Sequence, residues 1–249
     1  MSDSTPFGFR DVDPAEKAGM VRGVFESVAS RYDLMNDLMS AGVHRLWKSV
    51  LIDLLAPRNA EHFIDVAGGT GDIAFRILAR LKQSADASVT VCDLTPAMLE
   101  TGRARAIDRG LLQGIDWIAG NAESLPFADR SFDAYTIAFG LRNVTHIDKA
   151  LAEARRVLRP GGRFFCLEFS HVASEPLSKL YDLYSFELLP RLGQWVAGDR
   201  DSYQYLVESI RRFPPQRELA VMIEAAGLAR VKFRNLTGGI AAIHSGWRI

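Results

Sequence analysis

Residues 65–72 read Asp-Val-Ala-Gly-Gly-Thr-Gly-Asp and place three glycines between two carboxylates. An apolar run over residues 62–66 precedes them, and apolar residues at helical spacing follow over 72–82, so a strand, a glycine turn and a helix are predicted. Such a turn lies at the ligand-binding edge of a doubly wound sheet. Glycine lets a ligand approach the backbone where a Cβ atom would collide with it.

The charge of this turn restricts the ligand. A dinucleotide loop offers free amides and a helix N-terminus to pyrophosphate, whereas Asp65 and Asp72 repel phosphate and attract a cation. S-adenosylmethionine carries an ammonium and a sulfonium and no phosphate, so the turn favours it over NAD. The pattern Gly69-x-Gly71-x-x-Ala74 also fits a loose dinucleotide fingerprint, but that match alone has little specificity.

Two further polar residues follow predicted strands. Asp93 closes a β-rich run over 88–92 and lies about twenty residues past the turn, the usual offset of a carboxylate on ribose hydroxyls. Asn121 follows a run over 115–119 and offers adenine both a donor and an acceptor. Alone, Asp93 fits a solvated strand end and Asn121 an ordinary turn. Together with the glycine turn, we expect both at the ligand crevice.

Arg142 and Asn143 follow a predicted strand over 132–138 and the segment Phe139-Gly140-Leu141. We expect them beside the methyl donor, where a planar guanidinium can hold an oxyanion. The alternative is a surface arginine paired with an acid. The five histidines show no metal-ligand spacing, so no metal is expected.

Composition narrows the class of protein. With 249 residues the chain fits one large α/β domain or a domain with an extension. Its formal net charge is zero, which gives no basic face for nucleic acid. The two cysteines, Cys92 and Cys166, fall in predicted strands and are expected to be buried and reduced. The polar N-terminus and the lack of a long apolar run predict a cytoplasmic protein without a membrane span.

The alternation of predicted strands and helices indicates a mainly parallel, seven-stranded, doubly wound sheet with an antiparallel C-terminal edge hairpin. The remaining strands are expected at 162–168, 229–235 and 239–245, and helices at 96–109, 148–158 and 216–226. Residues 1–60 are interpreted as an arm and helical cap, loosely ordered to about residue 18 and then two helices. Residues 61–249 form the sheet domain, with a helical insertion at about 171–215.

Three segments identify a family resemblance. They are Tyr32-Asp33-x-Met35-Asn36-x-x-Met39-Ser40-x-Gly42-x-His44-Arg45-x-Trp47, Phe139-Gly140-Leu141-Arg142-Asn143, and Arg156-Val157-Leu158-Arg159-Pro160-Gly161-Gly162 through Glu168-x-Ser170. Over nearly its whole length the chain resembles the ubiquinone/menaquinone biosynthesis C-methyltransferases. The resemblance implies a Rossmann-like class I methyltransferase fold. It also implies S-adenosylmethionine-dependent methylation of a ring carbon of a polyprenylated quinol, which is 2-polyprenyl-6-methoxy-1,4-benzoquinol, demethylmenaquinol or both.

The expected site residues follow from the turn and the resemblance together. Those expected to bind the cofactor are Asp65, Gly69, Thr70, Gly71, Asp93, Asn121, Ala122 and Ala138. Ala138 replaces a serine found in many members, so any contact there uses the main chain. Arg142 and Asn143 are the expected catalytic residues, and Tyr32, Asn36, His44 and Tyr184 the expected quinol-binding residues.

The resemblance also implies a lipophilic partner. The prenyl tail needs an apolar path, which we expect between the N-terminal helices, with Phe25, Met35, Met39 and Trp47, and the insertion around Leu180–Trp195. Reversible peripheral contact with the inner face of the cell membrane is expected, and a homodimer or a quinone-biosynthesis complex is left open. The alternatives in function are a small-molecule O- or N-methyltransferase on the same fold and a non-catalytic S-adenosylmethionine-binding assembly protein.

Overall fold

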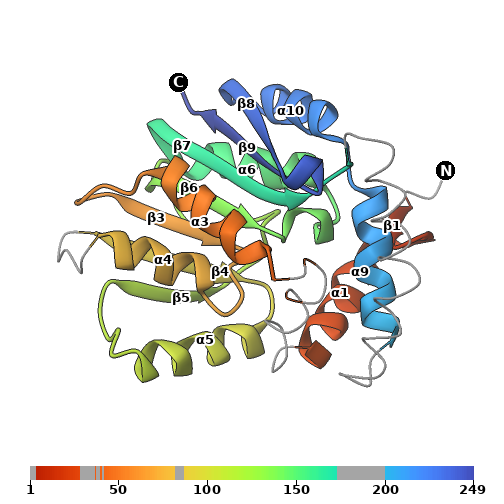
Figure 1. Ribbon diagram of the computed structural model, residues 1–249, viewed down its shortest axis with the longest axis horizontal. Coiled ribbons are helices and arrows are strands. Elements are labelled where there is room, and N and C mark those ends of the chain that lie inside the picture. Colours follow the sequence, from red (N-terminus) through yellow and green to blue (C-terminus); the bar gives the residue numbers. More distant parts are fainter. Residues whose placement is uncertain (1–3, 29–36, 38–39, 41, 82–86, 173–199) are drawn as a thin grey trace.

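The computed structural model of the protein describes residues 4–28, 37, 40, 42–81, 87–172 and 200–249. Its centre is a seven-stranded sheet in the order β5-β4-β3-β6-β7-β9-β8 (Figure 1). The strands are β3 (His62–Val66), β4 (Ser88–Asp93), β5 (Ile115–Ala119), β6 (Phe132–Ala138), β7 (Leu158–Phe169), β8 (Ala229–Leu236) and β9 (Ala241–Trp247). β3 to β7 run parallel, and β9 runs antiparallel to both of its neighbours, β7 and β8. The predicted doubly wound sheet with an antiparallel edge is confirmed.

Helices cover both faces of the sheet because its strands alternate between two hydrophobic clusters. Phe63 packs in one cluster with α3 (His44–Leu55) and α4 (Asp72–Arg80), which lie in front of the sheet in Figure 1. Ile64 packs in the other cluster with α6 (Ile147–Val157) and α10 (Gln216–Ala225). A sheet covered on both faces explains the nearly continuous apolar runs of the central strands.

The predicted strand and helix ranges match these elements closely, with two differences at strand starts. β9 begins at Ala241 because Thr237–Gly239 form the short helical turn η4. β7 begins at Leu158, whose partner is Phe132, and the register shifts before Arg163 pairs with Ala134. The Pro-Gly-Gly segment is therefore an irregularity within the strand region. Gly161 supplies the positive φ of 82° that this irregularity requires.

The expectation of loose order up to about residue 18 was wrong for the described residues 4–18. β1 (Thr5–Phe7) and β2 (Arg10–Val12) pair as a hairpin, and α1 (Pro14–Val28) starts at Pro14. Proline suits the first turn of a helix, and Asp13 Oδ1 accepts a hydrogen bond from the Ala15 amide at 2.8 Å. The helical nature of the insertion is confirmed over α9 (Arg200–Arg212), while residues 173–199 lie outside the described part.

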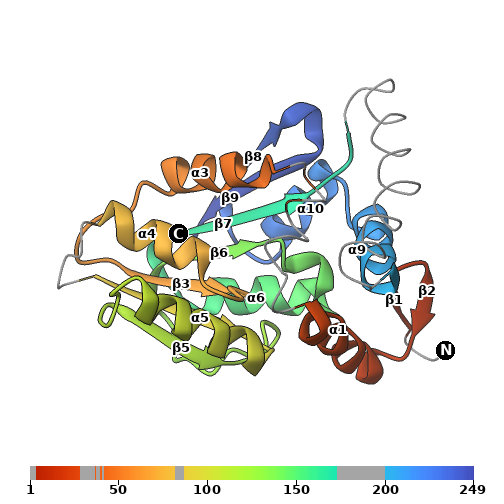
Figure 2. The ribbon, with the colours of Figure 1, turned by 60° about the horizontal axis from the view of Figure 1, so that its bottom comes forward.

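The hairpin, α1 and α9 lie together at one end of the sheet (Figures 1 and 2). Helix α5 (Pro96–Asp108) follows β4 and lies beside the edge strand β5, close to α1 (Figures 1 and 2). Among the helices of the described ranges, none has the length and apolar character needed to cross a bilayer. Cys92 and Cys166 are both buried free thiols, as the sequence predicts.

Candidate active site

The glycine turn joins β3 to α4 with little space around its backbone. A Cβ atom at Gly68 would lie 2.8 Å from both the carbonyl oxygen and Oδ2 of Asp65. Gly69 and Gly71 have positive φ values of 55° and 82°, which L side chains rarely adopt. The turn therefore needs glycine at these positions, and Gly71 is also the residue that precedes the first turn of α4.

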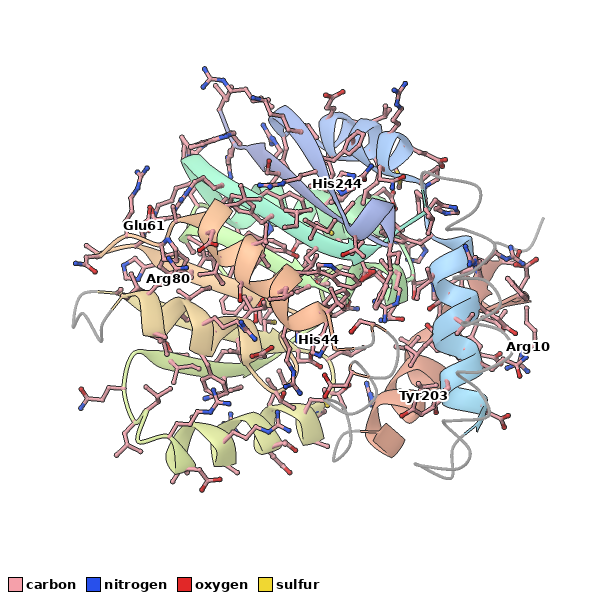
Figure 3. The ribbon with its side chains drawn as sticks, viewed as in Figure 1. Arg10, His44, Glu61, Arg80, Tyr203 and His244 are labelled. Atoms are coloured by element: carbon pink, nitrogen blue, oxygen red, sulfur yellow. The ribbon has the colours of Figure 1, made fainter. Side chains whose placement is uncertain are left out.

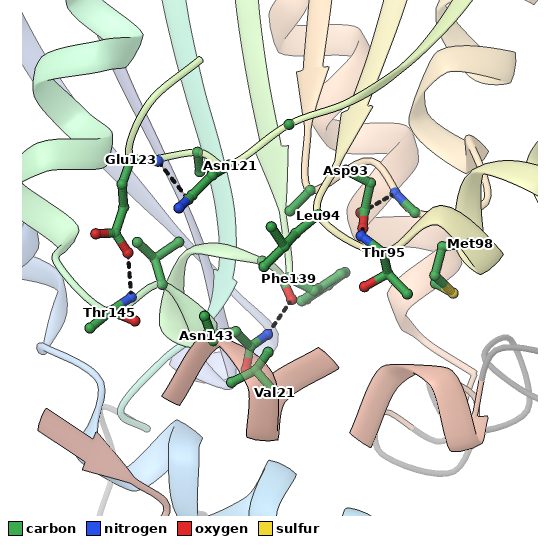
Figure 4. A pocket seen from close by; sticks show the side chains of 17 residues that line it. Val21, Asp93, Leu94, Thr95, Met98, Asn121, Glu123, Phe139, Asn143 and Thr145 are labelled. Atoms are coloured by element: carbon green, nitrogen blue, oxygen red, sulfur yellow. Dashed lines mark hydrogen bonds between the residues drawn. The ribbon is translucent and has the colours of Figure 1, made fainter. Parts of the chain in front are cut away.

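Asp93 ties this turn to the next strand end. Its Oδ2 accepts the Gly69 amide at 2.8 Å and its Oδ1 accepts the Thr95 amide at 2.8 Å. Burial raises the pKa of Asp93, although these amide hydrogen bonds oppose the shift. Thr95 occupies the cap position before Pro96, but its side chain makes no capping hydrogen bond. Asp93 thus fixes the spacing of two loops as well as facing a pocket (Figure 4).

That pocket lies beyond the carboxyl ends of four parallel strands. Its empty volume is about 760 Å³, a figure that includes the open mouth. Its walls come from the loops after β3, β4, β5 and β6 and from α1. Five of the residues expected at the site line it, namely Gly69, Asp93, Asn121, Ala122 and Asn143 (Figure 4).

Three other expected cofactor residues line a smaller cavity on the far side of Ala67. These are Asp65, Thr70 and Ala138, and they share this cavity with Lys48 and Asp72. The Thr70 hydroxyl accepts a hydrogen bond from Arg105 at 2.9 Å. The two hollows meet at Ala67, which lines both.

The electrostatics of the smaller cavity fit a cationic ligand group. Asp65 Oδ1 accepts the Thr136 hydroxyl at 2.8 Å, but its buried Oδ2 has no hydrogen-bond partner among the described residues. Burial raises the pKa of Asp65 to about 7. Lys48 is paired with Asp72 at 2.8 Å, so its charge is already balanced. The unmatched Asp65 oxygen therefore suits the ammonium of S-adenosylmethionine.

Two charged residues that line the two hollows, Glu123 and Lys48, were missed by the sequence interpretation. Glu123 lines the large pocket and accepts the amides of Thr145 and His146 at 2.9 and 3.2 Å. Its position two residues after Asn121 was the available signal. Lys48 lies one helical turn after His44 on α3, and that i, i+4 spacing could have placed it on the same face.

The segment after β6 is held in a strained conformation. Phe139 has a φ of 59°, unusual for a residue with a side chain. Its amide donates to the Leu167 carbonyl at 2.8 Å, and its carbonyl accepts Arg142 Nη1 at 2.7 Å. The short helix η2 (Leu141–Asn143) follows and brings Asn143 to the pocket.

Arg142 points elsewhere. Its Nη1 donates to both carboxylate oxygens of Glu168, at 2.7 and 3.0 Å, and each side chain is 1% exposed. The guanidinium also lies 5.5 Å from the centre of the Phe169 ring. Burial raises the pKa of Glu168 to about 7, and Arg142 opposes that rise. The structure thus brings Asn143 but not Arg142 to the pocket wall, and the arginine is buried rather than on the surface.

Of the residues expected to bind the quinol, only His44 is described. It is 3% exposed near the start of α3 (Figure 3), with Nε2 2.9 Å from Asp37 Oδ1. Burial, with Lys48 nearby, lowers the pKa of His44. Tyr32, Asn36 and Tyr184 lie outside the described residues.

Trp47 does not line an apolar path. It is 3% exposed, donates its indole N–H to Thr237 at 2.8 Å and packs edge-on against Phe169. The expectation that it contacts the prenyl tail is corrected, because these contacts place it in the core. The side chains of the other residues expected on that path lie outside the described part. No cluster of three or more potential metal ligands occurs among the residues the structure describes.

Solved structures with this architecture include methyltransferases. An S-adenosylmethionine-dependent methyltransferase from Thermotoga maritima matches with a TM-score of 0.64, 19% identity and coverage of 92% of this chain and 100% of that one. Phosphoethanolamine N-methyltransferase 2 of Haemonchus contortus, in complex with S-adenosyl-L-methionine, matches with a TM-score of 0.59, 12% identity and coverage of 81% and 52%. The [4+2]-cyclase SpnF matches with a TM-score of 0.62 at 16% identity over 81% and 79%, so the fold alone does not determine the reaction.

The fold is that of the class I S-adenosylmethionine-dependent methyltransferases. Within that class, residues 13–248 match the model of the ubiE/COQ5 methyltransferase family, and the chain belongs to this family. The ubiquinone/menaquinone biosynthesis C-methyltransferase UbiE of Paracoccus denitrificans is 61% identical over 98% of this chain and 97% of its own length. The enzyme of the same name from Brucella abortus strain S19 is 58% identical over 98% and 90%.

Proposed function

We propose that this protein transfers the methyl group of S-adenosylmethionine to a ring carbon of a polyprenylated quinol. The acceptor is 2-polyprenyl-6-methoxy-1,4-benzoquinol, demethylmenaquinol or both. The observation that carries the proposal is the 61% identity to a ubiquinone/menaquinone biosynthesis C-methyltransferase over 98% of this chain and 97% of that relative. The pocket at the carboxyl ends of the strands supports it, since this edge is where the fold binds ligands.

The residues at the two hollows can divide the cofactor between them. Asp93 is suited to the ribose hydroxyls, and Asn121 with Ala122 to the adenine. Thr70 and Ala138 line the smaller cavity, which is assigned to the methionine part, and Gly69 and Gly71 flank Thr70 in the turn. Asp65 is suited to the ammonium, because its buried Oδ2 has no partner among the described residues.

The chemistry requires a nucleophilic ring carbon. A quinol hydroxyl has a phenol-like pKa of ~10, and its deprotonation moves charge onto the adjacent ring carbon. S-adenosylmethionine supplies the electrophilic methyl on its sulfonium and leaves as S-adenosylhomocysteine when the S–CH3 bond breaks. The methylated ring carbon then loses its hydrogen as a proton, which restores the aromatic ring. The protein must hold the ring carbon in line with that methyl and stabilise the quinol oxyanion. Asn143 is the proposed donor, since it lines the pocket and carries an amide N–H.

Arg142 supports the same step by a different route. It fixes the Phe139 carbonyl and the start of η2, and thereby the position of Asn143. Its proposed effect on the oxyanion is therefore one of positioning, because Glu168 and Phe139 occupy its Nη1. Quinol contacts from Tyr32, Asn36, His44 and Tyr184 remain part of the proposal.

The proposed location of the reaction follows from the prenyl tail of the substrate. A tail of this kind partitions into lipid, so the protein is proposed to associate reversibly with the inner face of the cell membrane from the cytoplasm. Association as a homodimer or within a quinone-biosynthesis complex is compatible with this arrangement.

The test uses purified protein, methyl-labelled S-adenosylmethionine and short-chain forms of both quinols kept reduced. We expect label on a ring carbon, located by NMR of the product. Label on oxygen or nitrogen would indicate an O- or N-methyltransferase. Cofactor binding by calorimetry without transfer to either quinol would indicate a binding protein instead.

A further inference from the structure

Helix α9 reaches the pocket wall through one hydrogen bond. The hydroxyl of Tyr205 donates to Asn143 Oδ1 at 3.1 Å, and Tyr205 is buried. This hydrogen bond fixes which end of the Asn143 amide faces Tyr205, and the amide nitrogen at the other end can donate to a ligand. Among the described residues, that nitrogen has one long contact, with the Phe139 carbonyl at 3.5 Å (Figure 4). An amide nitrogen carries two hydrogens, so one remains for a pocket ligand.

The N-terminal hairpin holds Tyr205 in place. The Phe7 ring stacks on the Tyr205 ring with centroids 4.2 Å apart and an interplanar angle of 21°. The Phe9 amide donates to Glu208 Oε2 at 3.0 Å, and Arg212 Nη2 donates to the Phe9 carbonyl at 3.0 Å. The three α9 residues are spaced three and four apart and so share one helix face. The hairpin therefore determines where that face lies.

The N-terminal arm, which consists of the β1–β2 hairpin and α1, also contacts the residues that follow Asn143. Lys17 of α1 donates its ammonium to the Val144 carbonyl at 3.0 Å and to the Thr5 hydroxyl at 3.4 Å. Thr5 in turn donates to the Thr145 carbonyl at 3.4 Å. Val144 and Thr145 both line the large pocket. The arm thus restrains the backbone beside Asn143 directly and its side chain through Tyr205.

We propose that Tyr205 is a positioning residue that orients the Asn143 amide toward the quinol, and that the N-terminal arm contributes to methyl transfer through Tyr205. The role in methyl transfer rests on the proposed function, whereas the contact itself does not. Burial raises the pKa of Tyr205 well above its ordinary value, so the hydroxyl keeps its proton, and remains a donor, throughout the working pH range.

The first test is Tyr205→Phe, which removes the hydroxyl and keeps the ring that stacks on Phe7. We expect kcat to fall about tenfold, the scale of one lost hydrogen bond, with unchanged affinity for S-adenosylmethionine. Tyr203→Phe is the matched control, because Tyr203 is also buried on α9 (Figure 3), whereas the hydroxyl hydrogen-bonded to Asn143 belongs to Tyr205. A wild-type kcat in Tyr205→Phe, or an equal loss in Tyr203→Phe, would overturn the proposal.

A double-mutant cycle asks whether Tyr205 acts through Asn143. If it does, Tyr205→Phe should lower kcat no further when Asn143→Ala is already present. If the two losses of kcat multiply in the double variant, the proposal is overturned. Phe7→Leu keeps the hydroxyl but removes the stacking ring, so it should also lower kcat, and should add nothing to Tyr205→Phe. A wild-type kcat in Phe7→Leu would overturn the part assigned to the arm.

The side-chain amide signals of Asn143 in a ¹⁵N NMR spectrum separate this proposal from the proposed function. They should shift in Tyr205→Phe and stay in place in Tyr203→Phe, whether or not a quinol is methylated. Absence of quinol methylation by the wild type would refute the proposed function alone. Unshifted Asn143 signals in Tyr205→Phe would refute the positioning role alone.

Discussion

Replacing Arg142 with methionine separates a role in folding from a role in chemistry. The guanidinium donates to both oxygens of Glu168 at 2.7 and 3.0 Å, and both side chains are 1% exposed. Removing one partner of such a buried pair typically destabilises a protein by about 3–5 kcal/mol, because the other charge is left without compensation. We therefore expect Arg142→Met to lower the free energy of unfolding by about this amount near pH 8.

The destabilisation should depend on pH. Burial raises the pKa of Glu168 to about 7 even with Arg142 beside it, and the loss of Arg142 must raise it further. A carboxyl whose pKa rises on folding stabilises the fold fully below its unfolded pKa, and this contribution is lost as pH rises through the folded pKa. In the wild type the loss ends just above pH 7. In the variant the free energy of unfolding keeps falling above pH 7, by about 1.4 kcal/mol per pH unit. The difference in stability between the two proteins therefore widens from pH 7 to pH 9.

The assay is urea unfolding of both proteins at pH 6, 7.5 and 9, with the double variant Arg142→Met/Glu168→Gln as control. Removing both charges should restore most of the stability. The kcat of the double variant then isolates the chemical contribution. If Arg142 donated directly to the oxyanion, kcat should fall by a factor of ~10²–10³. Because Arg142 instead contacts Glu168 and Phe139, we expect kcat to fall about tenfold or less, the scale of one hydrogen bond. A destabilisation below about 1 kcal/mol in Arg142→Met, the range of exposed ion pairs, or one that does not change with pH, would refute the reasoning.

Three further outcomes are expected. Asp93→Ala should weaken S-adenosylmethionine binding by about 10–100-fold, since a charged acceptor for two loop amides is lost; unchanged affinity by calorimetry would contradict this. S-adenosylmethionine affinity should rise between pH 6 and 8, because Asp65, with a pKa of about 7, becomes ionised and attracts the ammonium; a flat profile would argue against that contact. Gly102→Ala places a Cβ atom 2.2 Å from the Trp117 ring and should destabilise by about 1–3 kcal/mol. Gly23→Ala, where no atom of the described residues apart from its chain neighbours and its own helix backbone lies within 4 Å of the added Cβ, should not destabilise the protein. Equal denaturation midpoints for the two variants would show that the ring contact is unimportant.

Local sequence patterns were sufficient to predict the strands of the central sheet, but they did not predict the N-terminal hairpin of β1 and β2. The predicted runs at 62–66, 115–119 and 132–138 coincide with β3, β5 and β6, because these strands are bounded by turns and carry their own apolar signal. The three-residue strands β1 and β2 are too short to show a period. They are ordered by contacts with α9 that span up to 203 positions of sequence, which no local window can detect.

The same distinction applies to the site residues, some of which could be placed from the sequence and some of which could not. The sequence by itself determined that Gly69, Asp93 and Asn121 meet, because the carboxyl ends of parallel strands share one edge whatever the surrounding contacts. Only the tertiary structure decided the direction of Arg142, which follows from Glu168 on the neighbouring strand. A buried guanidinium must be paired with an opposite charge. Its orientation therefore depends on a partner 26 residues away, through a contact that spacing along the chain does not encode.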